Sequence, residues 1–123
     1  MKIACFSFTD KGRALGDKLK SFNIDKYKIN HYSNHELEGG IKTLLKSAWK
    51  EYNGIIFISA TGIAVRMIAP FIKHKTVDPA IIVIDDLGKF SISLLSGHIG
   101  GANELARDMA ALLGAIPIIT TAT

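Results

Sequence analysis

The sequence has a single cysteine and no apolar run approaching the roughly 18 residues needed to cross a bilayer. A lone cysteine cannot form an internal disulfide, so we expect Cys5, which lies inside an apolar run, to be a buried core residue. Met1 and Lys2 lead directly into a strand pattern rather than a signal peptide. These absences exclude a disulfide-stapled secreted domain and a membrane-spanning protein, and we expect a cytoplasmic protein.

Motifs for metal, nucleotide and nucleic-acid binding are also missing. The four histidines show no metal-ligand spacing, so we expect no metal site. Gly97, Gly100 and Gly101 form G-x-x-G-G rather than the dinucleotide fingerprint, and no P-loop lysine follows. The net charge of +4 favours acidic partners, but the lysines are scattered singly, without a basic run among aromatics. We therefore expect an anionic small molecule as ligand and no nucleic acid.

The 123 residues, of which 48% are hydrophobic and 21% charged, suit one globular domain with a real core. Periodicity predicts strands at Ile3–Phe8, Tyr27–Tyr32, Gly54–Ser59, Ile81–Ile84, Phe90–Leu95 and Ile116–Thr120. It predicts helices after Asp10, over Ile41–Tyr52, from Ile63 to Ala69, and from Ala102 to a stop at Gly114. This alternation predicts a Rossmann-like α/β fold: a three-layer α/β/α sandwich with a mostly parallel twisted sheet of about six strands.

One strand must run antiparallel, because Asp85–Lys89 joins two strands as a hairpin with Gly88 at its left-handed position. If Ile81–Ile84 is that strand, Thr61 and the Ser96–Gly101 loop meet at the carboxyl edge of the sheet, where open α/β sheets bind ligands. If it is parallel, they lie at opposite edges. The connector Ile72–Ala80 reaches roughly 30 Å when extended, which is long enough to return the chain. We therefore predict that Ile81–Ile84 is antiparallel.

A glycine-rich junction lies between the fifth predicted strand and the last helix. Here Ser96-Gly97-His98 is followed by Gly100-Gly101 and a helix that opens at Ala102. Glycine permits positive φ and close backbone approach, and unpaired amides at the helix start would form an anion site. His98 adds the one side chain that exchanges a proton near neutral pH. In the alternative interpretation, the glycines serve only the turn.

A second junction, at Ala60-Thr61-Gly62, repeats the order of strand, small residues and helix start. Arg66 lies about one turn into the helix and could reach an anion held there. The alternative role for Arg66 is that of an exposed helix arginine.

Four longer motifs include these junctions and their neighbours: I-S-A-T-G-I-A-V-R-M-I-A-P (Ile58–Pro70), D-P-A-I-I-V-I-D-D (Asp78–Asp86), I-S-L-L-S-G-H-I-G-G-A-N-E-L-A (Ile92–Ala106) and I-T-T-A-T (Ile119–Thr123). Together they resemble the amino-terminal region of the CbiG family, the cobalt-precorrin-5A hydrolases of anaerobic cobalamin (vitamin B12) biosynthesis. The resemblance is specific over residues 54–123 and looser over residues 1–53. Because family members are longer, it implies that residues 1–123 form a single α/β domain whose partner is the protein's own carboxyl-terminal domain, absent here.

The resemblance also implies a reaction: hydrolysis of the ring A lactone of cobalt-precorrin-5A with release of acetaldehyde, giving cobalt-precorrin-5B. The enzyme would need no cofactor of its own, because the cobalt belongs to the substrate. This tetrapyrrole carries many acetate and propionate groups, which suit helix N-termini, an arginine and a net positive charge. An alternative is a non-catalytic tetrapyrrole- or anion-binding module, with the chemistry supplied by the missing domain. A homodimer is one assembly that the sequence leaves open.

Lactone opening needs a polarised carbonyl and an activated water or hydroxyl. We assign catalysis to His98 as general acid or base and to Ser96 as nucleophile or hydrogen-bond partner, with a turn role as the alternative for Ser96. Substrate binding is assigned to glycines and polar side chains at the junctions and near the last strand: Thr61, Gly62, Arg66, Gly97, Gly100, Gly101, Asn103, Thr120 and Thr121.

Overall fold

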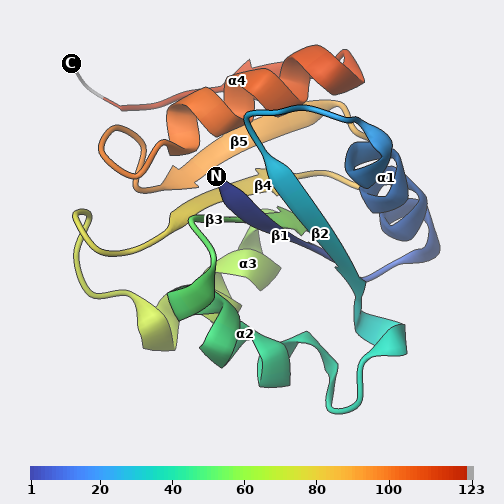
Figure 1. Cartoon of the computed structure of the whole chain (residues 1–123), viewed down its shortest axis with the longest axis horizontal. Coiled ribbons are helices and arrows are strands. Elements are labelled where there is room, and N and C mark those ends of the chain that lie inside the picture. The colour runs from blue at the N-terminus through green and yellow to red at the C-terminus, as the bar shows by residue number, and fades with distance from the viewer. Residues whose placement is uncertain (122–123) are drawn as a thin grey trace.

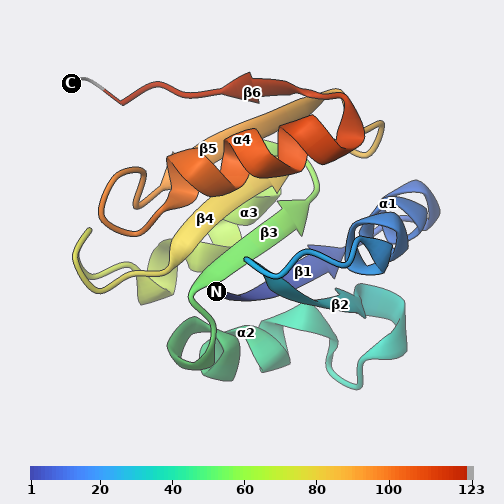
Figure 2. The same ribbon diagram turned by 45° about the horizontal axis from the view of Figure 1, so that its top comes forward.

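The computed structural model describes residues 1–121, so Ala122 and Thr123 of the fourth motif lie outside the described residues. Six strands form one sheet in the order β2-β1-β3-β4-β5-β6 (Figure 2). Their bounds are β1 Lys2–Ser7, β2 Lys28–Ser33, β3 Gly54–Ile58, β4 Ala80–Ile84, β5 Phe90–Leu95 and β6 Ile116–Ile118. Helices α1 (Asp10–Ser21) and α4 (Ala102–Leu113) cover one face, and α2 (Gly40–Glu51) and α3 (Thr61–Ile68) cover the other (Figure 1). The predicted α/β sandwich is confirmed.

Two apolar layers hold the helices to the sheet. Ile3 and Cys5 of β1 pack toward α1 and α4, while Ala4 and Phe6 pack toward α2 and α3. Cys5 is fully buried, as predicted, and this burial raises the pKa of its thiol far above the ordinary value. Strands buried on both faces in this way are typical of a parallel sheet covered by helices.

Local signals place most element ends. The Thr9 hydroxyl accepts a hydrogen bond from the Gly12 amide and so caps α1. Gly88 has φ 67° in the β4–β5 hairpin, as predicted, and Gly114 ends α4 with φ 69°. Two short 3₁₀ helices, Asn34–Glu36 and Ala69–Phe71, complete the connections. Within residues 1–121, no helix combines the length and the apolarity that crossing a membrane requires.

The direction of β4 differs from our prediction. β4 pairs parallel with β3 and antiparallel with β5, and β6 pairs parallel with β5, so it is β5 and β6 that run against the other four strands. The prediction that Ile81–Ile84 is the antiparallel strand is therefore wrong. α3 and the 3₁₀ turn after it carry the chain back along the sheet, so β4 starts at the edge where β3 started. The reach of the connector allowed both directions and could not decide between them.

Candidate functional site

The two predicted junctions lie at opposite edges of the sheet. Thr61 follows the carboxyl end of β3, which we call the carboxyl edge. The Ser96–Gly101 loop follows β5, which runs the other way, and so lies at the amino ends of β3 and β4, which we call the amino edge (Figure 1). The prediction that Thr61 and His98 share one edge is wrong, because it depended on β4 being the antiparallel strand.

Ser96 fixes the conformation of the loop at the amino edge. It has φ 60° and is the one non-glycine residue with positive φ among residues 1–121. Its buried hydroxyl donates to the Asp78 carbonyl at 3.1 Å, rather than to His98. A Cβ on Gly100 would lie 2.4 Å from the Ser96 Cβ, so this position needs glycine. Strained backbone of this kind persists only where its surroundings hold it and is concentrated at functional sites.

The first amides of α4 are already paired. The Ala102 amide donates to the Ser96 carbonyl at 3.1 Å, and the Asn103 amide donates to the Gly97 carbonyl at 3.0 Å. The Gly101 amide donates to the His98 carbonyl at 3.2 Å. The prediction that unpaired amides at this helix start face an anion is therefore wrong for these three groups, because the loop folds back and supplies its own carbonyl acceptors.

His98 is exposed and lines a cavity of about 200 Å³. The cavity lies between the loop and two neighbouring segments of chain, and its lining consists of Lys75, Ser96, Gly97, His98, Ile99 and Thr121. Among the hydrogen bonds and ion pairs of the described residues, none involves the His98 ring. The His98 imidazole and the Lys75 side chain therefore line one cavity, and the role of His98 in proton transfer stays a prediction.

Asn103 connects the loop to the segment that follows β6. Its Nδ2 donates to the Thr121 hydroxyl at 3.0 Å, and its Oδ1 accepts from the Ser93 hydroxyl at 2.7 Å. A Cβ on Gly97 would lie 2.7 Å from Thr121 and 2.8 Å from Asn103, so this contact also needs glycine. The structure thus brings predicted residues Gly97, Asn103 and Thr121 together beside His98, while Thr120 lies exposed next to them.

A larger cavity of about 610 Å³ adjoins the loop at the amino edge. Its lining combines aromatic, aliphatic and basic side chains: Met1, Trp49, Lys50, Tyr52, Asn53, Lys73, Val77, Asp78, Pro79, Ile99 and Gly100. The Asp78 carboxylate in this lining is buried, and its two oxygens share the single N–H of the Lys73 backbone amide, at N···O distances of 3.1 and 2.9 Å. Sequence reasoning missed this cavity because Lys50 and Lys73 come from separate elements and share no motif.

At the carboxyl edge, Arg66 folds back over the first turn of α3. A Cβ on Gly62 would lie 3.8 Å from an Arg66 guanidinium nitrogen, which agrees with the predicted reach of this side chain. Thr61, Gly62 and Arg66 are all exposed. Their binding roles stay predictions, and they now concern a surface separate from His98.

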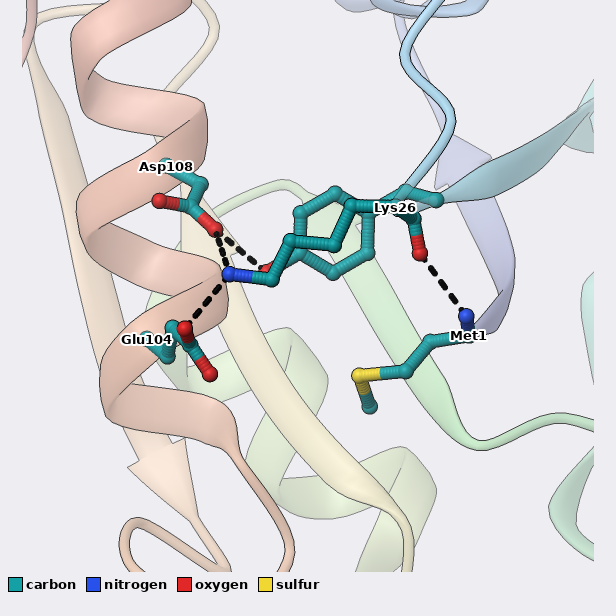
Figure 3. Close-up of polar contacts among 5 residues, drawn as sticks. Met1, Lys26, Glu104 and Asp108 are labelled. Atoms are coloured by element: carbon teal, nitrogen blue, oxygen red, sulfur yellow. Dashed lines mark hydrogen bonds and ion pairs between the residues drawn. The ribbon is translucent and has the colours of Figure 1, made fainter.

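A cluster that the sequence did not predict holds the start of α4 (Figure 3). Lys26 Nζ lies 2.5 Å from Glu104 Oε1 and 2.9 Å from Asp108 Oδ2, and the Tyr27 hydroxyl donates to Asp108 Oδ2 at 2.5 Å. The amino group of Met1 donates to the Lys26 carbonyl at 2.8 Å. The cluster ties the α1–β2 connection to the first turns of α4 and so fixes the helix that follows the loop.

The contacts in this cluster also shift the pKa values of its side chains. Hydrogen bonds to Glu104 and then Asp108 raise the pKa of Lys26. Burial, followed by the hydrogen bond to Asp108, raises the pKa of Tyr27 to about 12. Burial opposes ionisation of Asp108, but the hydrogen bonds from Tyr27 and Lys26 together outweigh it and lower the pKa of this carboxyl.

A second unpredicted cluster has the order of a hydrolytic triad. Ser7 Oγ lies 2.7 Å from His31 Nε2, and His31 Nδ1 lies 2.8 Å from Asp17 Oδ1. Ser7, however, is fully buried, and a Cβ on Gly16 would lie 2.4 Å from the His31 ring. No substrate reaches this serine, so the cluster is a packing link between β1, β2 and α1.

Comparison with known proteins gives one family. The family model described as "Cobalamin synthesis G N-terminal" matches residues 43–123. A Salmonella typhimurium protein named cobalt-precorrin-5A hydrolase is 45% identical over 98% of this chain, and one from Priestia megaterium with the same name is 56% identical over 69% of it. The chain spans 36% of the Salmonella relative and 23% of the Priestia relative.

A solved structure agrees with this result. The crystal structure of a cobalamin biosynthesis protein G homologue from Sulfolobus solfataricus superposes with a TM-score of 0.77 at 36% identity. The superposition covers 97% of this chain and 36% of that one. From the family match, the relatives and the shared fold together, the chain belongs to the Cobalamin synthesis G N-terminal family.

Proposed function

We propose that this chain is the substrate-binding region of a cobalt-precorrin-5A hydrolase, which opens the ring A lactone of its substrate and releases acetaldehyde. The observation that carries the proposal is the 45% identity, across 98% of the chain, to a relative with that name. The rest of the longer relatives corresponds to the carboxyl-terminal partner domain, and the reaction takes place in the cytoplasm. The cobalt is part of the substrate, and the protein needs no cofactor.

The cavity at the amino edge suits one side of a carboxylated tetrapyrrole. Trp49, Tyr52 and Ile99 offer apolar contact to the macrocycle. Lys50 and Lys73 on this cavity, and Lys75 beside His98, supply cations for the acetate and propionate groups. Since Asp78 is held by its own chain, its charge faces the Lys73 amide rather than the ligand.

His98 is the residue we propose for proton transfer. An exposed imidazole without a protein partner can take a proton from the attacking water and return it to the leaving oxygen of the lactone. Ser96 is better suited to hold the loop than to attack the substrate, because its hydroxyl is buried and bonded to Asp78.

One observation favours a second candidate, a non-catalytic binding module. The amides expected to polarise the lactone carbonyl are paired with loop carbonyls, so an oxyanion hole would have to come from the partner domain. In this second candidate function, residues of the amino edge bind the carboxylates of the precorrin, and the partner domain supplies every catalytic group.

A chimera tests both candidates. This chain replaces the aligned third of the Salmonella relative, and acetaldehyde release from cobalt-precorrin-5A is measured under anaerobic conditions, together with substrate affinity. We expect His98→Ala to lower turnover by roughly 10²- to 10⁴-fold with little change in affinity. His35→Ala, at an exposed histidine of the 3₁₀ turn after β2, is the matched control.

The outcomes separate the two candidates. Full turnover in the His98→Ala chimera would establish the binding module and remove the catalytic role. A folded chimera with intact His98 that neither binds the precorrin nor releases acetaldehyde would contradict the proposed function as a whole.

A further inference from the structure

A groove runs between α2 and α3 at the carboxyl edge, away from His98. It consists of two cavities of about 450 Å³ and 240 Å³ that have Lys42, Arg66 and Met67 in common. Most of the remaining lining residues are apolar, among them Phe8, Ile63 and Phe71, and Asn34 is a polar one.

The charged side chains that line this groove are basic. Lys42 and Arg66 line both cavities, and no aspartate or glutamate of residues 1–121 lines either one. In the same part of the chain, no ion pair involves Lys42 or Arg66. Asn34 Oδ1 accepts from the Ile41 amide at 2.9 Å, which leaves the Asn34 Nδ2 as a further donor at the groove. Two cations on one surface repel each other, and the attraction of both to a bound anion would offset that repulsion.

The groove also lies where the sheet topology favours ligands. The connection after β1 leads outward to β2, whereas the connection after β3 leads to β4 on the other side, so the chain order reverses between β1 and β3. Phe8 follows β1 and Ile63 follows β3, and both line the groove. Ile63 is 41% exposed, so apolar surface remains available to a ligand.

We propose that this groove is a second binding site, for a small anionic molecule with a flat apolar body. Lys42 and Arg66 hold the carboxylate or phosphate, while Phe8, Ile63 and Met67 contact the apolar body. The proposal uses no residue of the amino edge, so its failure would leave the proposed hydrolase function standing; it gives Arg66 a ligand other than the precorrin expected from the sequence.

Calorimetric titration with 2-naphthoate tests the site, and neutral 2-naphthamide is the matched ligand without the charge. We expect 2-naphthoate to bind at least about fivefold more tightly than 2-naphthamide and to weaken as salt rises. Arg66→Gln and Lys42→Gln should each raise the Kd for 2-naphthoate by about three- to tenfold. Lys46→Gln, one turn further along α2 and outside both linings, should leave the Kd unchanged.

Three results would overturn the proposal: equal affinity for the two ligands, an unchanged Kd in both groove variants, or the same loss in Lys46→Gln. Thermal melts of each variant separate a lost contact from a lost fold. Sodium phosphate as competitor distinguishes the sources of affinity: competition only at concentrations far above the Kd for 2-naphthoate supports an amphipathic ligand, whereas phosphate that binds as tightly as 2-naphthoate contradicts the role of the apolar walls.

Discussion

Replacing Gly16 with alanine should destabilise the protein, although alanine is the better helix former. Gly16 lies inside α1, where the change to alanine in an open environment stabilises a helix by about 1 kcal/mol. Here a Cβ would lie 2.4 Å from His31 Nε2 and 2.6 Å from two ring carbons, far inside ordinary contact. The His31 side chain is only 5% exposed, so the ring has little room to move away.

The size of the effect follows from what the ring contacts. A displaced ring breaks the 2.7 Å hydrogen bond to Ser7 Oγ, which leaves a buried hydroxyl unpaired at a cost of about 1–3 kcal/mol. Overpacking adds about 1–3 kcal/mol. After subtracting the gain of about 1 kcal/mol in helix propensity, we expect a net loss of about 1–5 kcal/mol in the free energy of unfolding.

Urea unfolding of four proteins measures this interaction: wild type, Gly16→Ala, His31→Ala and the double variant. Without the His31 ring the alanine has space, so Gly16→Ala should change sign and stabilise the His31→Ala background by about 0.5–1 kcal/mol. Gly62→Ala in α3 is the control, since its Cβ would meet no atom closer than 3.8 Å and should be neutral or mildly stabilising.

A Gly16→Ala protein as stable as wild type would refute the reasoning. So would an equal loss in the presence and absence of the His31 ring, because the loss would then arise elsewhere in α1.

Three further predictions concern single side chains. Cys5 should resist thiol reagents in the native protein and react in urea, since it is buried with a raised pKa; rapid native labelling would contradict this. The pKa of Asp108 is lowered on folding, so its contribution to stability is present above about pH 5 and is lost as the pH falls. Asp108→Asn should therefore flatten the acid side of the stability profile, and unchanged profiles would count against the cluster. Ser96→Ala should cost about 1 kcal/mol through the lost bond to Asp78, whereas Ser96→Gly should cost less because glycine tolerates φ 60°; the reverse order would show that the positive φ at position 96 carries no strain, and an unchanged stability in Ser96→Ala would show that the bond is unimportant.

Local patterns in the sequence predicted the elements well because short-range physics determines them. The buried Cys5, the left-handed Gly88 and the end of α4 at Gly114 each depend on a few neighbouring residues. The direction of β4 depends on packing over the whole crossover. A usable signal was nevertheless present: Ala80–Ile84 is an uninterrupted apolar run, typical of a parallel strand, while Phe90–Leu95 alternates with serine.

The candidate site was predicted in part. The residues that were predicted are close to one another in the order of the elements, and those that were missed are far apart in the sequence. Asn103 and Thr121 meet the loop because they follow from the order of β5, α4 and β6 along the chain. Lys26 meets Glu104 across 78 positions of sequence, and no spacing rule connects such residues. The amino-edge cavity likewise collects side chains from several separate segments.

The position of Met1 limits how this protein can be handled in the laboratory. Met1 lines the large cavity, so an affinity tag fused to Met1 would lie next to the surface proposed for the precorrin. The β4–β5 hairpin is at the far edge of the sheet, and its Leu87 is 61% exposed. An exposed turn of this kind tolerates insertion. A short labelling peptide placed after Leu87 would therefore immobilise or report on the protein while leaving Met1 and the amino edge unobstructed.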